Sequence, residues 1–303
     1  MPEQMLNTKE VAEYLGINEK QVYALIKAGR IPCTRVTGKW VFPKKLIDEW
    51  MLSSARKSSS AARTRRRMEG RLFASGSNDP VLDLLINQKY YDGFYIFSCN
   101  TGSTEGLRLM GESLSDIAWC HLLDPDTGTY NIPYIASHLA DKKIAVIHLF
   151  HREIGFLTSP ETSKKIKGFN DLASGIRFMN RQNGSGIRIF LDYNLKKQGI
   201  DPASIKGYAD EVLTHFEIGL SVLSGNADAG ISSVAISKLM GLPFIPLASE
   251  SFDMVVGMDT FFEKGIQTFI ETLQSKKFRK TVESLGSYDF SDSGKILYST
   301  TGA

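Results

Sequence analysis

Hydrophobic residues change their spacing partway along the chain. In the first fifty residues they recur every three or four positions in two short stretches, each after an Asn that can cap a helix. Asn7 precedes one stretch and Asn18 the other, and Gly16 and Gly29 follow them as helix-ending glycines. The stretches contain Val11, Ala12, Tyr14 and Leu15, then Val22, Leu25 and Ile26. The pattern predicts two short helices joined by a tight turn, a helix-turn-helix.

The residues after this pair predict a β-hairpin and a closing helix. Two β-type segments, Thr34–Val36 and Trp40–Phe42, flank a turn at residues 37–39. Pro43 then begins a helix that we expect to run over Lys44–Leu52. A hairpin beside a helix-turn-helix is a wing, so we expect residues 1–52 to form a small winged helix-turn-helix domain.

A polar, basic segment separates this domain from the rest of the chain. Residues 53–67 read SSARKSSSAARTRRR and hold no large apolar side chain, so they have nothing to bury. We expect a linker over residues 53–70 with little fixed structure of its own. Residues 71–303 then alternate amphipathic helical stretches with apolar runs such as Phe94–Cys99, Ile144–Phe150 and Phe252–Gly257. This alternation predicts an α/β domain.

Charge is divided unevenly between the two parts. The 303 residues carry a formal net charge of +3. Residues 1–70 hold fourteen Lys and Arg against seven Asp and Glu, whereas the remainder of the chain is net acidic. A basic head on an acidic body suggests a polyanionic partner for the head, although a solvated surface with a basic linker would give the same count.

Composition excludes several other classes. A hydrophobic fraction of 42% is ordinary for a soluble globular protein, and no apolar run reaches the roughly 18 residues of a membrane helix. The polar N-terminus does not resemble a signal peptide, so we expect no membrane partner. Three widely spaced cysteines (Cys33, Cys99, Cys120) favour a reducing cytoplasm. Without CxxC or HExxH spacing, we expect no metal ligands from the protein.

The N-terminal pattern resembles a known family. Residues 6–50, LNTKEVAEYLGINEKQVYALIKAGRIPCTRVTGKWVFPKKLIDEW, closely resemble the excisionase-type, MerR-related winged helix-turn-helix modules. The resemblance implies double-stranded DNA as a partner, with the second helix in the major groove and the wing on the backbone or minor groove. Modules of this kind also bind proteins, so a protein partner stays open.

The candidate DNA contacts lie on the second helix and the wing: Lys20, Gln21, Tyr23, Lys27, Arg35, Lys39 and Trp40. Lys20 and Gln21, near the start of the helix, could reach base edges. Lys27, Arg35 and Lys39 would hold phosphates. The alternatives are a solvated face for the lysines of the helix and packing inside a small domain for the two aromatic residues.

Three loops of the larger domain place Gly, Ser or Thr just ahead of a helical stretch, at residues 98–104, 180–186 and 214–215. A helix N-terminus offers unpaired N–H groups and a partial positive charge, and hydroxyls add further donors. A strand-to-helix turn needs such residues for its own sake. Three such loops in one domain nevertheless favour an anion site.

The larger domain also resembles a known family. RFMNRQNGSGIRIFLDYNLKKQGID (residues 177–201) and IAWCHLLDPDTGTYNIPYI (residues 117–135) are similar to the periplasmic-binding-protein-like domain of cytoplasmic regulators and some molybdopterin-related proteins. The resemblance implies a two-lobed, type II α/β fold that closes around a ligand. Lobe one would comprise about 71–152 and 257–303, and lobe two about 153–256.

The same resemblance carries over ligand contacts from both lobes: Ser75, Ser77, Asn78, Ser103, Thr104, Arg181, Gln182, Ser185, Thr214, His215, Ser232 and Ser233. Many members have Thr where this chain has Ile187, so one hydroxyl is missing. For Arg181, a salt bridge between the lobes is the structural alternative.

Together the two resemblances imply a one-component transcription regulator without a cofactor, acting as a homodimer or higher homo-oligomer. The order of the loops resembles that of molybdate- and tungstate-binding periplasmic proteins, so tungstate or molybdate is the first expectation for the effector. A small organic anion paired with Arg181 is the second. The alternative class is a cytoplasmic anion-binding protein whose basic head docks a protein. Without a GxSxG motif or a P-loop lysine, we expect no enzyme.

Overall fold

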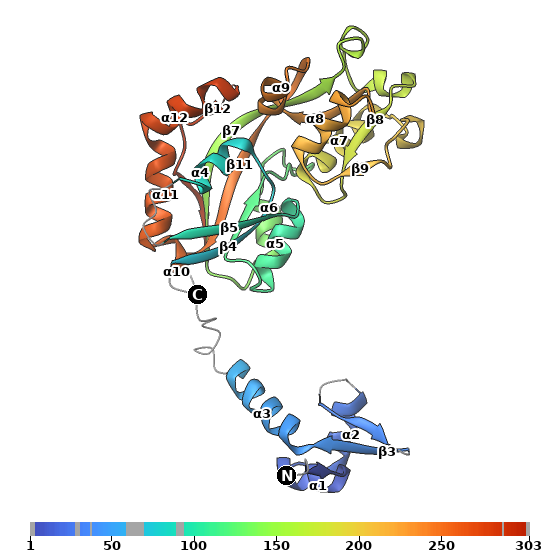
Figure 1. The fold of residues 1–303 in the computed structure, drawn as a ribbon, viewed down its shortest axis with the longest axis vertical. Helices are drawn as coiled ribbons and strands as arrows, with labels where there is room; N and C mark the ends of the chain where they lie inside the picture. The colour runs from blue at the N-terminus through green and yellow to red at the C-terminus, as the bar shows by residue number, and fades with distance from the viewer. Residues whose placement is uncertain are drawn as a thin grey trace. The chain divides into compact units, whose positions relative to one another are not determined.

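The computed structural model describes residues 4–27, 31–36, 38–58, 70–88, 94–286 and 288–300. The chain divides into two compact units, residues 1–67 and 68–303 (Figure 1). Among the helices of the described ranges, none is long and apolar enough to cross a membrane. The predicted helix-ending Gly29 and the wing residue Thr37 lie outside the described residues.

The first unit is the predicted winged helix-turn-helix. Its helices are α1 (Thr8–Leu15), α2 (Glu19–Lys27) and α3 (Lys44–Ser58), and its antiparallel sheet has the order β1 (Met5–Leu6), β3 (Lys39–Pro43), β2 (Thr34–Val36). Asn7 accepts hydrogen bonds from the backbone of Lys9 and Glu10, and the Glu10 carboxylate accepts one from the Asn7 N–H, as a capping box requires. Gly16 ends α1 at a φ of 65°.

The third helix is longer than the sequence pattern predicts. We expected it to end at Leu52 and a linker to follow, but α3 continues to Ser58. Serine, alanine, arginine and lysine carry no strong helix-breaking signal, and the segment holds neither Pro nor Gly, so the helix propagates past its last apolar residue. The remaining linker residues, 59–69, lie outside the described part of the chain.

A ten-stranded mixed sheet organises the second unit. Its order is β5-β4-β6-β11-β7-β10-β8-β9, and β12 and β13 also pair with β7. The strands are β4 (Arg71–Gly76), β5 (Tyr95–Asn100), β6 (Ile117–Cys120), β7 (Ile144–Thr158), β8 (Phe178–Arg181), β9 (Glu211–Val212), β10 (Ala229–Ser233), β11 (Phe244–Gly257), β12 (Tyr288–Asp289) and β13 (Ile296–Ser299). The expected α/β fold is therefore confirmed.

Helices cover the sheet within each lobe (Figure 1). Lobe one carries α4 (Pro80–Ile86), α5 (Ser103–Gly111), α6 (Ile132–His138), α10 (Met258–Phe261), α11 (Lys264–Gln274) and α12 (Lys276–Val282). Lobe two carries α7 (Gly186–Gln198), α8 (His215–Leu223) and α9 (Val234–Met240). Short 3-10 helices lie at Thr162–Lys164, Phe169–Ser174, Pro202–Ser204 and Glu283–Leu285.

Two long antiparallel strands, β7 and β11, pass from one lobe into the other. On β11, Phe252 packs in the core of lobe one and Ile245 against the core of lobe two. The crossover on β11 therefore lies before Phe252 and not at Gly257, where the sequence placed it. The register of the two strands explains why the crossover on β11 lies earlier than predicted. Glu250 on β11 pairs with Arg152 on β7, so both strands pass between the lobes at this pair.

Candidate functional site

The predicted DNA-contacting residues of α2 lie on its solvent face. Lys20, Gln21, Tyr23 and Lys27 are all exposed, with half of the Tyr23 surface accessible. Val22 points the other way and is fully buried, so α2 presents one face to the core and one to solvent. Tyr23 is therefore not the packed core residue that was its alternative.

Gln21 has a second role in the structure. Asn18 Oδ1 accepts from the backbone N–H of Gln21 at 2.9 Å, and Gln21 Oε1 accepts from the N–H of Asn18 at 3.1 Å. This reciprocal pair is a capping box for α2. The Gln21 amide oxygen therefore stabilises the helix start, and a base contact would have to use its amide N–H or break the cap.

One cation of the wing, Arg35, is held in place by its neighbours. The guanidinium of Arg35 lies 5.5 Å from the ring centroid of Trp40, and its Nε donates to the carbonyl oxygen of Gly38 at 3.1 Å. Lys39 is exposed, and Trp40 is half-buried against the small core of the unit. Trp40 thus both packs in the unit and supports a charged side chain of the wing.

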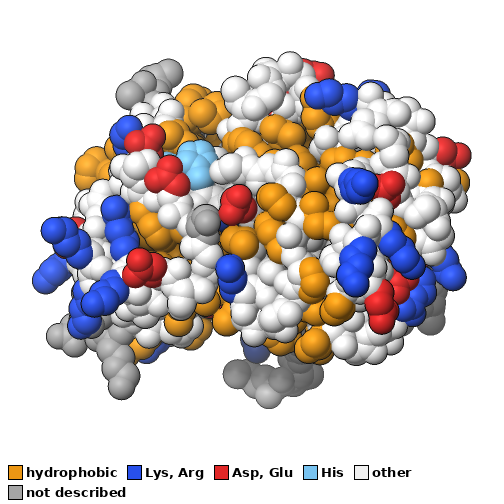
Figure 2. Space-filling view, turned by 90° about the horizontal axis from the view of Figure 1, so that it is seen from above, with side chains coloured by type: hydrophobic (Ala, Val, Ile, Leu, Met, Phe, Trp, Pro, Cys, Tyr) orange, Lys and Arg blue, Asp and Glu red, His pale blue; other side chains and the backbone are white. Residues whose placement is uncertain are grey.

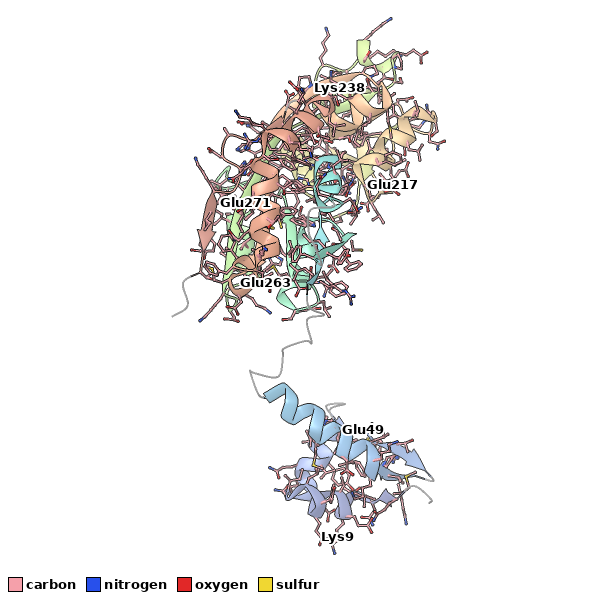
Figure 3. The ribbon with its side chains drawn as sticks, turned by 60° about the vertical axis from the view of Figure 1, so that its left-hand side comes forward. Lys9, Glu49, Glu217, Lys238, Glu263 and Glu271 are labelled. Atoms are coloured by element: carbon pink, nitrogen blue, oxygen red, sulfur yellow. The ribbon has the colours of Figure 1, made fainter. Side chains whose placement is uncertain are left out.

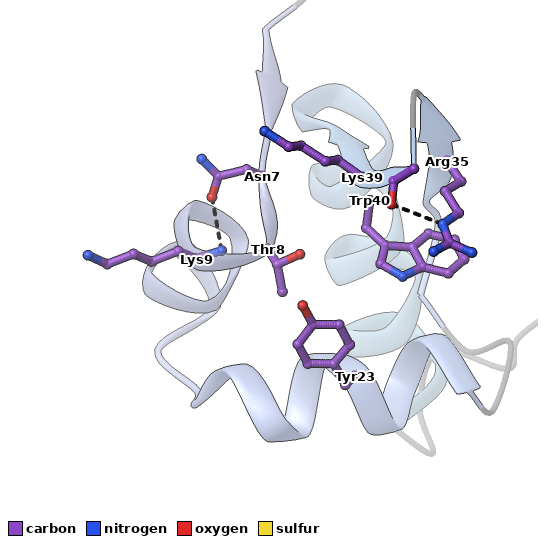
Figure 4. A pocket seen from close by; sticks show the side chains of 8 residues that line it. Asn7, Thr8, Lys9, Tyr23, Arg35, Lys39 and Trp40 are labelled. Atoms are coloured by element: carbon purple, nitrogen blue, oxygen red, sulfur yellow. Dashed lines mark hydrogen bonds between the residues drawn. The ribbon is translucent and has the colours of Figure 1, made fainter.

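An open pocket of about 390 Å³ lies between the start of α1, the face of α2 and the wing (Figure 4). Its lining comprises Asn7, Thr8, Lys9, Tyr23, Arg35, Gly38, Lys39 and Trp40. Three cationic side chains and a helix N-terminus around one hollow are suited to a phosphate group.

In the second unit, a buried arginine joins the two lobes. Arg152 Nη1 donates to Asp79 at 2.7 Å and to the Asn78 carbonyl oxygen at 3.1 Å, both in lobe one. Its Nη2 lies 3.1 Å from Nε2 of His215 in lobe two, and its Nε donates to Glu250 on β11 at 2.8 Å. Two buried carboxylates therefore flank this one cation at the crossover.

Two histidines of this network are held neutral. Burial, together with Arg152 and Arg181, keeps the pKa of His215 well below its ordinary value. Because Nε2 of His215 faces an Arg152 N–H, Nδ1 carries the proton and lies 3.3 Å from the Ser232 hydroxyl. His121 places Nδ1 2.9 Å from Glu250, and burial lowers its pKa against the opposing effect of that carboxylate.

Arg181 is buried without a carboxylate partner in the described part of the chain. Its Nη2 donates to the Leu213 carbonyl oxygen at 2.8 Å and its Nε to Gln182 at 3.3 Å, while Nη1 has no hydrogen-bond partner. Burial, and next the charge of Arg152, lower the pKa of Arg181 to about 9. The alternative of a salt bridge between the lobes is therefore not what the described residues show.

Unpartnered buried polar atoms gather where the lobes meet. Nine described side chains hold such an atom, and seven of them lie at or after strand ends at this junction: Ser77, Asn78, Thr104, His121, Arg181, Gln182 and Ser233. The lobes touch here, since the N–H of Thr104 donates to the carbonyl oxygen of Gly184 at 3.3 Å. Unsatisfied polar atoms are costly inside a protein, so this set is suited to a polar ligand.

Other predicted ligand contacts already have partners. The hydroxyl of Ser75 lies 3.5 Å from the Gly106 carbonyl oxygen, and Ser103 accepts from the N–H of His121 at 3.3 Å. Ser185 caps α7 and Ser232 donates to the His215 carbonyl oxygen. Thr214 bonds to Glu217 at the start of α8 (labelled in Figure 3). These five hydroxyls position the loops, which is the structural role that strand-to-helix turns require.

Four residues of the junction were missed by sequence reasoning: Asp79, His121, Arg152 and Glu250. Arg152 is the only arginine within the apolar run of β7, and a buried charge in such a run is a signal that could have been used. His121 directly follows Cys120, and adjacent residues of a strand face opposite ways, so the local pattern gives this histidine no partner. Its true partner, Glu250, lies 129 positions away in the chain.

The described residues contain no group of three or more His, Cys, Asp or Glu that could hold a metal ion. On the face of the second unit that Figure 2 shows, basic and acidic side chains are interspersed, with hydrophobic side chains between them. Such a mixed surface differs from the cationic hollow of the first unit.

Two family models match the chain. A helix-turn-helix domain model covers residues 5–55, and a PBP superfamily domain model covers residues 86–274. Both are binding domains, one for DNA and one for small ligands, and neither is an enzymatic type.

One relative matches nearly the whole chain, and two solved structures match about three quarters of it. The Bacillus subtilis protein YvgK is 30% identical over 301 residues, which cover 96% of this chain and 97% of that one. A phosphate-bound, putative phosphate transporter substrate-binding protein of Clostridium perfringens matches 75% of this chain and 99% of its own, with 14% identity and a TM-score of 0.52. A tungstate transporter protein of Geobacter sulfurreducens matches 71% and 98%, with 14% identity and a TM-score of 0.51. The chain therefore belongs to the PBP superfamily and carries its ligand-binding fold behind an N-terminal helix-turn-helix domain.

Proposed function

We propose that this protein is a one-component transcription regulator that senses a small anion in the cleft between its two lobes. The observation that carries the proposal is Arg181, a buried cation with an unpartnered Nη1 among unpartnered hydroxyl and amide groups. A charge of this kind is costly in the ligand-free protein and is compensated when an anion binds.

Tungstate or molybdate is the effector that we propose first. A tetrahedral oxyanion offers acceptor oxygens in several directions, which suits donors that converge from both lobes, such as Ser77, Thr104, Gln182 and Ser233. A small organic anion that pairs bidentately with Arg181 is the second candidate, because that guanidinium lacks a carboxylate partner among the described residues.

Closure of the cleft is the proposed link to DNA. Arg152 contacts both lobes and the crossover strand β11, so its network depends on how the lobes meet. A ligand that binds the closed state better shifts the population towards it. In a homodimer, we propose, that shift alters the spacing of the two winged helix-turn-helix domains and so the affinity for a two-part operator.

We expect the intact protein to bind its operator with an affinity that falls as salt rises. Each phosphate contact should add roughly 0.9 to the slope of log affinity against log salt. Lys39→Ala should weaken binding to all sequences alike, whereas Lys20→Ala should reduce the preference for the operator over random DNA. Lys238→Ala is the control, because it removes a charge from α9 in the second unit (Lys238 is labelled in Figure 3). It should change neither the affinity for DNA nor the preference for the operator. Equal retention of operator and random DNA by the wild type would contradict the regulator proposal.

Removing an unpartnered hydroxyl should weaken anion binding more than removing a partnered one. A hydrogen bond to a charged group contributes about 1.5–3 kcal/mol, so Ser77→Ala and Thr104→Val should each raise the dissociation constant roughly tenfold to a hundredfold. Ser75→Ala is the matched control, because its hydroxyl already faces the Gly106 carbonyl oxygen. Isothermal titration calorimetry with tungstate, molybdate, sulfate, phosphate and small carboxylic acids measures these differences. Equal losses for Ser75 and Ser77 would argue against the assigned cleft.

A further inference from the structure

The charges of the ligand cleft do not match a dianion. Arg152 lies 2.7 Å from both Asp79 and Glu250, so these three groups together carry one negative charge. Arg181, a buried cation with no carboxylate partner in the described junction, brings the four groups to neutral. Tungstate and molybdate carry two negative charges at neutral pH. A dianion buried in this site therefore needs further positive charge.

His121 is placed to supply that charge. It follows β6 in lobe one, is 1% exposed and stacks on Phe252 at 5.8 Å between ring centroids. The start of α7 in lobe two approaches the same ring so closely that a Cβ on Gly186 would lie 2.5 Å from Nδ1 and 2.6 Å from Cε1. Nδ1 is occupied by Glu250, while Nε2, on the other side of Cε1, is buried without a partner.

The charged and titratable groups around His121 come from four elements. They are Glu250 on β11, Arg152 on β7, Arg181 on β8 and His215 on α8, whose ring centroid is 6.1 Å away. Burial and the two arginines favour a neutral ring, and Glu250 opposes them. In the ligand-free protein the ring therefore donates from Nδ1 to Glu250 and leaves a lone pair on Nε2. A bare dianion next to that lone pair would be repelled.

We propose that His121 is a ligand-binding residue that takes up one proton from solvent on Nε2 when a dianionic oxyanion enters, and donates it to the anion as a hydrogen bond. This inference rests on the proposed anion-sensing function. The bound cleft then holds three cations, Arg152, Arg181 and His121, against Asp79, Glu250 and the two charges of the ligand, so the proton lowers the excess negative charge from two to one. Glu250 remains on Nδ1 and stabilises the imidazolium.

The proposal fixes the direction of the pH dependence. Ligand binding raises the pKa of His121 from its lowered ligand-free value, so the complex binds one proton more than the free protein between those two pKa values. Within that window the affinity for tungstate falls about tenfold for each unit of rising pH, as linkage requires. We expect the window to include pH 6.5 to 8, since the ligand-free pKa lies below the ordinary 6.5.

The number of protons taken up on binding is measured by calorimetry of the full chain with sodium tungstate at pH 7.5. Two buffers of different ionisation enthalpy are used, because the difference between the two binding enthalpies gives that number. We expect uptake of about one proton per anion for the wild type and close to none for His121→Gln, whose neutral amide needs no proton to donate. His148→Gln is the matched control. His148 is also 1% exposed, lies 2.8 Å from a carboxylate (Asp253) through Nδ1 and has an unpartnered Nε2, but it packs against residues 294–295 in lobe one. Its loss should leave the proton uptake unchanged.

The outcomes separate this inference from the proposed function. Tight tungstate binding without proton uptake, or uptake that persists in His121→Gln, overturns the role of His121 and leaves the anion sensor standing. Proton uptake that disappears equally in His148→Gln overturns the assignment to His121. Binding of a small carboxylic acid without binding of tungstate, molybdate, sulfate or phosphate overturns the role of His121 and leaves the anion sensor standing. Absence of binding by all of these anions overturns both the inference and the anion-sensing proposal.

Discussion

Replacing Arg152 with alanine is expected to cost the protein about 3–5 kcal/mol of its free energy of unfolding, the range seen when one partner of a buried ion pair is removed. The side chain is fully buried, and its loss would leave Asp79 and Glu250 without their cation. Burial alone would raise the pKa of Glu250, but the charge of Arg152 and the hydrogen bonds from His121 and Arg152 hold it below its ordinary value. The stability that this depressed pKa contributes is present above the ordinary pKa of a glutamate and is lost as pH falls.

Urea denaturation at pH 7.5 measures the loss, and an exposed arginine with the same number of carboxylate partners is the control. Arg108 pairs with Glu105 and Glu112 along α5 but is about half exposed, so Arg108→Ala should cost less than about 1 kcal/mol. If Arg152→Ala does not fold, the triple variant that also carries Asp79→Asn and Glu250→Gln should recover part of the stability, because neither position then holds a carboxylate without its cation. Equal losses for Arg152 and Arg108 would contradict the described network.

Replacing Arg181 with methionine should have opposite effects on binding and on stability. Methionine keeps much of the side-chain volume but removes a buried charge that has no carboxylate partner among the described residues, so the ligand-free protein should gain roughly 1–2 kcal/mol of stability. Anion binding should weaken at least a hundredfold, as expected when a buried hydrogen-bonded charge pair loses one member. For a carboxylate or phosphate the loss should be nearly complete. An oxyanion held mainly by neutral donors should lose less affinity than a carboxylate or phosphate does.

Thermal unfolding with and without ligand, followed by calorimetry, separates these effects. Arg177 is the matched control, since it pairs with Asp228 at 2.6 Å on the surface and is 44% exposed. Arg177→Met should leave anion binding unchanged. A destabilised Arg181→Met protein that still binds the anion tightly would show that Arg181 has a structural role and would remove the main support for the proposed site.

Local sequence signals predicted the first unit well. Asn7, Glu10 and Gly16 act within one helix, and their caps depend on neighbours three or four positions away, so the pattern of residues is sufficient. The predicted end of α3 at Leu52 was wrong because the local sequence holds no signal that ends the helix there. Nothing in the local sequence forces a helix of Ser, Ala, Lys and Arg to stop where its apolar positions end.

The cleft was predicted only in part, because its chemistry depends on contacts between distant positions. The resemblance found Arg181 and the Ser77-Asn78 turn, but it could not distinguish Ser77, whose hydroxyl is unpartnered, from Ser75, whose hydroxyl faces a carbonyl oxygen. Arg152 and Glu250 are 98 positions apart and meet only through the register of β7 with β11. A single sequence gives no measure of that register.

The crossover strands also determine where the chain can change its length. The pairing of β7 with β11 has two register shifts, at Pro246/Ala248 and Phe252/Asp253, and Glu250 lies between them. Successive residues of a strand face opposite sides, so deletion of one residue between the shifts would turn either Glu250 or Phe252 away from its present partners. Insertions and deletions should therefore accumulate in the outer loops of the lobes, while the segment from Pro246 to Asp253 keeps a constant number of residues among related chains.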